Sequence, residues 1–337
     1  MKKFNVAIVG ATGLVGQTFL KVLKERQFPI ENLYLMASSR SAGKQVEYNG
    51  VSYVVEELCE TSFDKQIDIA LFSAGGEISK KYAPIAAAHG TIVVDNSSAW
   101  RMDPTIPLVV PEVNPHAIKP DNKIIANPNC STIQCVVPLN VLHQAYHIKR
   151  IVYSTYQAVS GSGISGLNDL ENGVNGLEQT FYPHPIAYNC LPHIDQFLDN
   201  GYTKEEIKMI EETKKILGDA SLKITATTVR VPVKYGHSVS INVEFEKAFE
   251  LADVFELLKG ATGIKVVDDV KNNQYPLAIH VEGQDEVYVG RIRRDFSTEN
   301  GLNLWVVADN IRKGAATNTV QIAEHLIQHL TESEVFA

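Results

Sequence analysis

The feature that most constrains the fold is a glycine-rich turn near the start of the chain. An apolar segment, residues 4–9, leads directly into the pattern G-x-x-G-x-x-G, and residues 17–25 then have helical periodicity. Glycines in such a turn permit a tight reversal and bring backbone N–H groups close to a pyrophosphate at the helix start. The strand before the turn and the helix after it are the context that this pattern requires. The sequence therefore predicts a doubly wound, Rossmann-type α/β domain, with dinucleotide contacts at Gly10, Thr12, Gly13, Leu14, Val15 and Gly16.

The end of the second predicted strand bears on which dinucleotide binds. Residues 33–37 are apolar and lead into Ser38, Ser39, Arg40 and Ser41. Domains of this type that bind NAD carry an acidic residue about 20 positions after the glycines, where it holds the ribose 2′-hydroxyl. Here hydroxyls and an arginine stand in its place, and an arginine suits a 2′-phosphate. The alternative is a polar loop with an incidental arginine, but we predict NADP as the cofactor.

Further α/β units place polar residues at the ends of predicted strands. Residues 68–73 and 91–94 are apolar; Gly75 follows the first segment, and Ser98 and Arg101 follow the second. In open parallel sheets, ligands bind at the carboxyl ends of the strands. We therefore expect Gly75 and Arg101 to face a bound ligand.

Cys130 stands at a similar junction. A short apolar strand, residues 123–126, precedes it and an apolar run of helical length, residues 135–142, follows. A thiolate at a helix start is stabilised by unpaired N–H groups and by the helix dipole, so the thiol pKa falls. Ser131 and Thr132 are expected to cap the helix, and Asn129 is a residue that tolerates an unusual turn conformation. A buried, inert cysteine is the alternative.

The second half of the chain changes character. Strands are predicted over residues 148–158, 222–231 and 237–246, the last two joined by a short turn, with a hairpin over residues 288–295 and 302–308. Together with a helix over residues 203–217 they predict an α+β domain, a mixed or antiparallel sheet covered by helices on one side. We assign residues 1–129 to the dinucleotide-binding domain, completed by a C-terminal helix in residues 315–337. Residues 130–314 are assigned to a catalytic and dimerisation domain.

His237 is the best-placed general base in this second domain. Strand alternation puts His237 on the same face as the apolar residues Val239 and Ile241. Histidines change charge near neutral pH, which suits them to proton transfer. A simply packed, hydrogen-bonded histidine is the alternative.

Composition excludes several classes of function. The net charge of −8 over 337 residues argues against a nucleic-acid partner, which would need a basic face. The four cysteines show neither a CxxC pair nor zinc-ligand spacing, so no metal site is predicted and a reducing, cytoplasmic location is expected. Neither a signal peptide nor an apolar stretch long enough for a membrane span is seen.

Five motifs in order along the chain resemble the aspartate-β-semialdehyde dehydrogenase family. They are residues 10–16 (GATGLVG), 127–132 (NPNCST), 156–161 (YQAVSG), 212–215 (ETKK) and 230–237 (RVPVKYGH). The resemblance spans essentially the whole chain.

The resemblance implies roles that the residues alone do not establish. It makes Cys130 the nucleophile, His237 the acid/base and Gln157 the residue that positions the substrate. It further implies that the substrate is held by Arg101 and Lys215 at phosphate, Glu212 at the amino group and Arg230 at the carboxylate. Ser160, Gly161 and Asn318 resemble cofactor contacts. Glu212 and Lys215 do share a helical face, but without the resemblance this segment would be interpreted as a solvated charged helix.

The implied reaction is the NADPH-dependent reductive dephosphorylation of L-aspartyl 4-phosphate to L-aspartate 4-semialdehyde through a thioester on Cys130. It belongs to the biosynthesis of lysine, diaminopimelate, threonine and methionine, and a homodimer is the implied assembly. The nearest alternative is a related acyl-phosphate reductase, such as N-acetyl-glutamyl-phosphate reductase or a glyceraldehyde-phosphate dehydrogenase. A thiol hydrolase using Cys130 and His237, or a non-catalytic nucleotide sensor, are alternatives of other classes.

Overall fold

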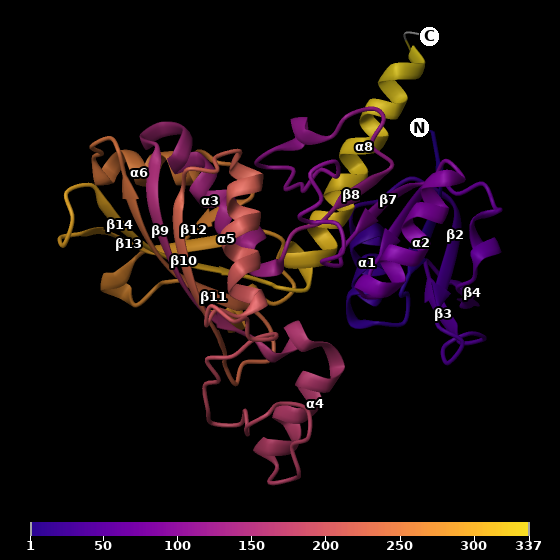
Figure 1. Cartoon of the computed structure of the whole chain (residues 1–337), viewed down its shortest axis with the longest axis horizontal. Helices are drawn as coiled ribbons and strands as arrows, with labels where there is room; N and C mark the ends of the chain where they lie inside the picture. Colours follow the sequence, from indigo (N-terminus) through magenta and orange to yellow (C-terminus); the bar gives the residue numbers. More distant parts are fainter. Residues whose placement is uncertain (1, 336–337) are drawn as a thin grey trace. The chain divides into compact units, whose positions relative to one another are not determined.

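The computed structural model of the chain describes residues 2–335. These residues form two compact units (Figure 1). The first unit runs to Pro128 and resumes at Ala315, and the second spans Asn129–Gly314. The final helix therefore belongs to the same unit as the first strand.

The first unit is built on a six-stranded sheet in the order β5-β2-β1-β6-β7-β8, in which every neighbouring pair is parallel. Its strands are β1 (Phe4–Val9), β2 (Ile30–Ala37), β5 (Glu56–Glu57), β6 (Ile69–Phe72), β7 (Ile92–Asp95) and β8 (Ile124–Ala126). A small antiparallel hairpin, β3 (Gln45–Tyr48) and β4 (Val51–Val54), lies in sequence between β2 and β5. The strand order reverses between β1 and β6, which is where sheets of this kind bind ligands.

Helices cover both faces of this sheet. On one face, Phe19 of α1 (Leu14–Glu25) and Val320 of α8 (Thr317–Val335) pack with Ile8 of β1. On the other, Ala83 of α2 (Gly76–Ala88) packs with Val9. Successive side chains of a strand point to opposite faces, so a strand buried on both faces is a nearly continuous apolar run. This arrangement confirms the predicted doubly wound domain.

The second unit is built on a mixed sheet in the order β10-β9-β11-β14-β13-β12. Its strands are β9 (Ile148–Gln157), β10 (Lys223–Arg230), β11 (His237–Phe245), β12 (Ile264–Val266), β13 (Val287–Asp295) and β14 (Gly301–Ala308). The pairs β9–β10 and β12–β13 are parallel, and the other three pairs are antiparallel. The predicted mixed sheet and the β13–β14 hairpin are confirmed.

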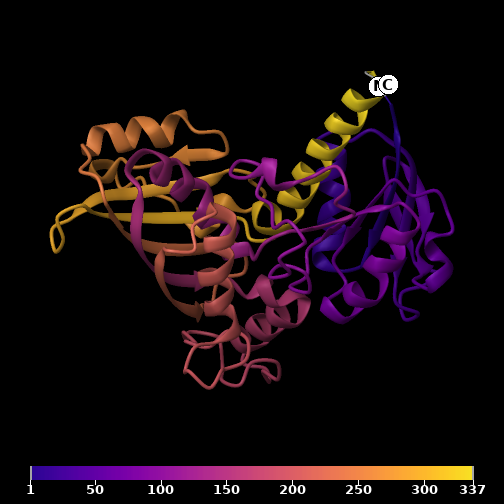
Figure 2. The same cartoon turned by 45° about the horizontal axis from the view of Figure 1, so that its top comes forward.

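Three longer helices contact the strands of this sheet, namely α3 (Cys130–Tyr146), α5 (Lys204–Leu217) and α6 (Leu251–Gly260). Figure 2 shows α6, in orange, lying over the strands. The hydroxyls of Tyr153 on β9 and Thr213 on α5 are 3.2 Å apart, which marks the helix-covered face. On the opposite face Tyr156 is 41% exposed and contacts Trp305, and the short helix α7 (Ala278–Val281) contacts β14.

Short helices and turns complete the two units. The helix α4 (Gly163–Val174) follows β9, and a π-helical turn (Arg312–Ala316) precedes α8. Short 3₁₀ turns are η1 (Glu60–Phe63), η2 (Pro115–Ala117), η3 (Val159–Ser162) and η4 (Val270–Asn272).

One relation between strands was not predicted. The strands β10 and β11 follow one another in sequence, joined by a short turn, yet β9 lies between them and pairs with both. As a result the carboxyl ends of β9 and β10 and the start of β11 lie at the same end of the sheet. Gln157, Arg230 and His237 are brought together there.

Candidate active site

Cys130 is the first residue of α3, as the sequence predicted for a strand–turn–helix junction. The helix is capped by Asn129, whose Oδ1 accepts hydrogen bonds from Ser131 N at 3.0 Å and Thr132 N at 3.2 Å. The expectation that Ser131 and Thr132 act as caps is therefore wrong, because both lie inside the first turn. Asn129 has φ −60° and ψ 143°, an ordinary extended conformation rather than an unusual one.

The environment of Cys130 differs from that of the other cysteines. Cys130 is partly exposed, whereas Cys59 and Cys190 are exposed and Cys135 is buried. Burial holds the pKa of the Cys135 thiol well above its ordinary value. A Cβ atom built on Gly314 would lie 2.9 Å from Cys130 Cβ, so a side chain at position 314 would crowd the cysteine. Sequence reasoning missed Gly314, because nothing local connects it to Cys130.

His237 begins β11 and is fully buried. Its Nδ1 accepts a hydrogen bond from Ala158 N at 2.9 Å, so the proton of the neutral ring is on Nε2. Burial, with Arg230 adding to it, holds the pKa of His237 well below its ordinary value of 6.5. Within the described residues Nε2 has no hydrogen-bond partner. The ring is thus a neutral donor with its N–H unused.

Arg230 lies beside this histidine. Its Nη1 donates to Ala158 O at 2.8 Å, so the backbone of Ala158 binds both Arg230 and His237. From the point where a Cβ of Gly161 would stand, Arg230 Nη1 is 2.9 Å away and His237 Nε2 is 3.2 Å away. A side chain at position 161 would therefore displace Arg230 and crowd His237. Ser160, its neighbour, is held by Asn310 through their side chains, at 3.0 Å.

A network of buried carboxylates joins Cys130's helix to Gln157. Glu212 is 1% exposed, and its Oε2 accepts the Asn129 N–H at 2.6 Å. Gln157 donates from Nε2 to Glu205 Oε1 at 3.1 Å, and the same oxygen accepts from Asn129 Nδ2 at 2.8 Å. Glu205 was not singled out from the sequence, where it is one of several charges on a helix. Lys215, three residues after Glu212 on α5, is partly exposed.

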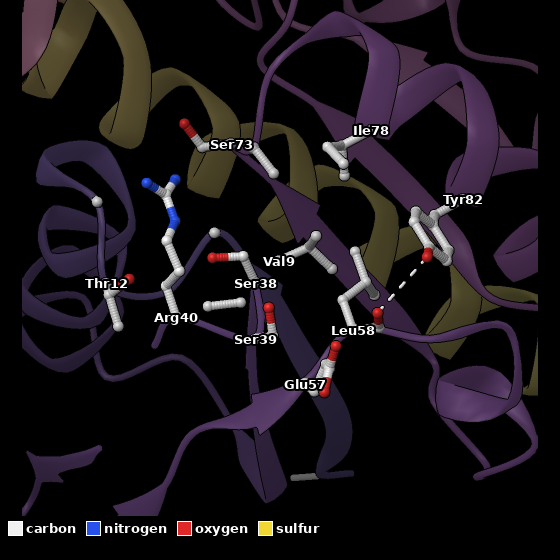
Figure 3. Close-up of a pocket in the computed structure, with 14 residues that line it drawn as sticks. Val9, Thr12, Ser38, Ser39, Arg40, Glu57, Leu58, Ser73, Ile78 and Tyr82 are labelled. Carbon is white, nitrogen blue, oxygen red and sulfur yellow. Dashed lines mark hydrogen bonds between the residues drawn. The ribbon is translucent and has the colours of Figure 1, made fainter. Parts of the chain in front are cut away.

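The first unit contains a cavity of about 500 Å³ at the carboxyl ends of its strands. Its lining includes six of the cofactor contacts that the sequence predicted: Gly10, Thr12, Gly13, Ser38, Ser39 and Arg40. Figure 3 shows the guanidinium group of Arg40 reaching from the Ser38–Ser39 side toward Ser73. Glu57, Leu58, Ile78 and Tyr82 also line the cavity and were missed, because they come from β5, the segment after it and α2.

The turn at this cavity fits a pyrophosphate. Gly10 has φ +90°, and a Cβ there would lie 2.3 Å from Ser73 O, so only glycine fits. Gly13 is the N-cap of α1, and among the described residues no side chain caps this helix. The N–H groups at the start of α1 are therefore open to an anion.

The remaining predicted contacts of the first unit lie outside the lining of this cavity. Gly16 packs against the turn, since a Cβ there would lie 2.2 Å from Gly10 O. Ser41 accepts a hydrogen bond from Thr12 Oγ1 at 3.1 Å, and Gly75 is the N-cap of α2. Leu14 and Val15 open α1 and are partly exposed.

Two further predicted residues of this unit are buried. Asn318 donates to Asn127 Oδ1 at 2.7 Å and to Val109 O at 3.0 Å. Arg101 donates from Nη2 to Asn96 O at 3.0 Å. Both side chains therefore have partners within the first unit.

The described chain has neither a metal-binding cluster nor a membrane-spanning helix. Residues 2–335 contain no group of three or more His, Cys, Asp or Glu side chains arranged to hold a metal ion. In the same range no helix is both long enough and apolar enough to cross a membrane.

Comparison with protein families gives two matches. Residues 5–120 match the family described as "Semialdehyde dehydrogenase, NAD binding domain", and residues 139–313 match "Semialdehyde dehydrogenase, dimerisation domain". The chain is 56% identical over 334 residues to the aspartate-semialdehyde dehydrogenase of Aquifex aeolicus, covering 96% of this chain and 98% of that one.

Solved structures give the same result. The crystal structure of aspartate semialdehyde dehydrogenase II from Vibrio cholerae complexed with ASA has a TM-score of 0.93 and 49% identity, over 97% of this chain and 99% of that one. The enzyme from Candida albicans with NADP has a TM-score of 0.78 and 27% identity, over 96% and 98% of the two chains.

Proposed function

The chain belongs to the aspartate-semialdehyde dehydrogenase family of oxidoreductases, and from this premise we propose that it reduces L-aspartyl 4-phosphate to L-aspartate 4-semialdehyde with NADPH, through a thioester on Cys130. The family resemblance predicted from the five motifs is thereby confirmed. The observation that carries the finer proposal is the capped start of α3, where a partly exposed Cys130 is joined through Asn129 and Glu205 to Gln157.

The proposed chemistry begins at Cys130. Its thiolate attacks the acyl carbon of the substrate, phosphate leaves, and a thioester remains on the sulfur. When bound, NADPH supplies the hydride that reduces the thioester. Breakage of the C–S bond then releases the aldehyde and returns the thiolate.

His237 supports this chemistry as a donor. Because its Nδ1 accepts from Ala158 N, the Nε2–H is the group that can face a developing oxyanion. The low pKa of His237 keeps the ring neutral, so it has one N–H to donate to the oxyanion and carries no extra proton to transfer as an imidazolium. Collapse of the thiohemiacetal anion to aldehyde and thiolate requires no base. We therefore propose His237 as an oxyanion donor; the general-base role predicted from the sequence stays a prediction.

The substrate's charged groups have candidate partners among the predicted residues. Arg230, 5% exposed beside His237, is proposed for the carboxylate, and Glu212 for the amino group. Arg101 and Lys215 are proposed for the phosphate, which is the group that arginine and lysine bind well. Gln157 is proposed to orient the acyl group.

NADP is proposed as the cofactor of the cavity in the first unit. The side chains at Ser38, Ser39, Arg40 and Ser41 offer hydroxyls and a guanidinium to a 2′-phosphate. The Candida albicans relative was solved with NADP, which agrees with this choice. Ser160, Gly161 and Asn318 stay proposed cofactor contacts, as do the glycine-turn residues Gly10 to Gly16 and Gly75. The proposed dinucleotide-binding domain comprises residues 1–129 and 315–337, and the proposed catalytic and dimerisation domain comprises residues 130–314.

A homodimer is proposed as the assembly. The second unit exposes several large apolar side chains on α4 and in the segment between α4 and α5: Ile164, Val174, Leu177, Phe181, Tyr188 and Phe197. Tyr188 alone is 85% exposed. Exposed apolar groups of this size gathered in one segment are typical of a protein interface. The description of the matching family as a dimerisation domain supports the same assembly. A cytoplasmic role in the synthesis of lysine, diaminopimelate, threonine and methionine follows from the proposed reaction.

The test is a reverse assay with aspartate semialdehyde, phosphate and NADP, in which NADPH absorbance is recorded. The wild-type protein should form NADPH, and N-acetyl-glutamate semialdehyde should not replace the substrate. Cys130→Ser should lose nearly all turnover, since serine lacks a thiolate, whereas Cys135→Ser should retain it. Mass spectrometry after treatment with the acyl phosphate should find an adduct on the Cys130 peptide. An active Cys130→Ser enzyme would exclude the thioester.

A further inference from the structure

Glu205 is a buried charged residue to which the proposed reaction gives no role. It lies in the first turn of α5 and is 5% exposed. A carboxylate so far from water is costly unless other charges and hydrogen bonds offset the lost hydration. The partners of Glu205 therefore indicate why it is there.

Its two oxygens have different partners. Oε1 accepts hydrogen bonds from Asn129 Nδ2 at 2.8 Å and Gln157 Nε2 at 3.1 Å, while Oε2 accepts from Lys208 Nζ at 3.2 Å. Burial by itself would raise the pKa of Glu205, but Lys208, the two amides and Arg230 together hold that pKa below its ordinary value. Glu205 is thus a carboxylate at neutral pH.

This carboxylate decides how two amides are oriented. With Asn129 Nδ2 on Glu205, Asn129 Oδ1 is left to cap α3 at Ser131 N and Thr132 N. With Gln157 Nε2 on Glu205, Gln157 Oε1 accepts from Thr155 Oγ1 at 3.0 Å. An acceptor-only group is needed to hold both NH₂ groups while it also binds an ammonium.

We infer that Glu205 is a positioning residue, which holds the cap of the Cys130 helix and the side chain of Gln157 in one fixed relation through a single oxygen. This inference rests on the function proposed above for Cys130 and Gln157. Misplacement of reacting groups by about 1 Å costs on the order of 100-fold in rate, so losing this link should affect turnover more than binding.

The neighbouring Glu206 is a matched control. It is also buried on the first turn of α5, at 7% exposure. Its oxygens accept from backbone groups instead, Thr203 N at 2.7 Å and Thr228 N at 3.0 Å. Glu206 thus stabilises the start of α5 and its contact with β10, and it touches neither amide.

The experiment compares Glu205→Gln, Glu206→Gln and Gln157→Ala in the reverse assay, with thermal denaturation to confirm folding. For Glu205→Gln, kcat should fall about 10- to 100-fold while KM for the aldehyde changes less than about threefold. Because Glu205 acts in part through Gln157, the loss of kcat in the Glu205→Gln, Gln157→Ala double variant should be smaller than the product of the two single losses. A kcat within about threefold of the wild type, an equal loss in Glu206→Gln, or multiplying losses in the double variant would overturn the inference.

A second readout needs no turnover and so separates this inference from the proposed function. Iodoacetamide alkylation of Cys130, followed by peptide mass spectrometry across a pH range, reports the thiol pKa. A carboxylate joined to the Cys130 helix cap raises that pKa, so the pH midpoint should fall in Glu205→Gln and stay in place in Glu206→Gln. An unchanged midpoint in Glu205→Gln would contradict the inference. An inactive wild-type enzyme would instead reject the proposed reaction and leave this readout standing.

Discussion

Arg40 and Glu57 line the same cavity with opposite charges, and each favours a different form of the cofactor. An acidic side chain there accepts from the ribose 2′-hydroxyl of NAD, while an arginine binds the 2′-phosphate of NADP. The sequence indicated only the arginine, because the expected position for an acid is the end of β2. Glu57 belongs to β5 and lies beside the end of β2, because it pairs with Ala37.

Substitutions at these two residues should move cofactor preference in opposite directions. Arg40→Asp should lower the ratio of kcat/KM for NADP over NAD at least about 10-fold, since it removes a charge-assisted pair and adds a repulsion. Glu57→Gln should raise the same ratio, because it removes a negative charge that repels the 2′-phosphate of NADP in this cavity. Steady-state kinetics with both cofactors measure the ratio.

The control is Lys44→Asp, a charge reversal at an exposed residue of the same unit that does not line the cavity. It should leave the ratio within about twofold of the wild type, because solvent and salt screen the charge of an exposed side chain. A ratio unaffected by Arg40→Asp would reject the 2′-phosphate role of Arg40.

At the scale of elements, α3 illustrates what local sequence can and cannot predict. The apolar run and the turn before it were sufficient to predict a helix that begins at or just after Cys130. They were not sufficient to identify its cap, because Asn129 is oriented by Glu205, which lies 76 residues further along the chain. Ser, Thr and Asn are all favoured as helix caps by local propensity, so propensity alone did not show which of Asn129, Ser131 and Thr132 is the cap. The long-range contact with Glu205 distinguishes Asn129 from the other two.

The same reasoning explains the sheets. Near-continuous apolar strands predicted the parallel sheet, and period-two alternation in β11 predicted which residues are buried with His237. The insertion of β9 between β10 and β11 was not predictable, because pairing partners depend on contacts far apart in sequence. For the same reason the approach of Gly314 to Cys130 and of Gly161 to Arg230 was invisible in the sequence.

Substitution of the cap tests the charge around α3. Asn129→Asp keeps a good cap but places a second carboxylate against Glu205, so the pKa of Cys130 should rise. Iodoacetamide alkylation of Cys130 should then need a higher pH, and kcat should fall. Asn129→Ser keeps a cap without the charge and should leave the alkylation midpoint near that of the wild type. A midpoint that moves to lower pH in Asn129→Asp would contradict the proposed electrostatics.

At the scale of the whole molecule, the buried titratable groups determine how stability responds to pH. Burial raises the pKa of Asp95 in the first unit and lowers the pKa of His237 in the second. The first effect acts in the carboxylate range and the second just below neutral pH. In the second range His237 is a fully buried group whose protonation opposes folding.

The sign of the His237 contribution follows from its depressed pKa in the folded state. Below the unfolded value of about 6.5 the unfolded chain binds a proton that the folded chain does not, so the free energy of unfolding falls as pH drops. The slope from this one group is at most about 1.4 kcal/mol per pH unit. His237→Asn retains an acceptor for Ala158 N–H and removes the titration.

Urea denaturation of the wild type and of His237→Asn between about pH 7 and about pH 5 gives the free energy of unfolding of each protein. The contribution of His237 is the difference between the two values, because contributions from other groups such as His143 are common to both proteins and cancel. Fluorescence of Trp305 in a Trp100→Phe background reports the second unit, where His237 lies. The stability advantage of the wild type over His237→Asn should shrink steadily as pH falls. A flat difference for His237→Asn would mean that the imidazole protonates without cost in the folded protein, and the neutral Nε2–H donor would then be excluded.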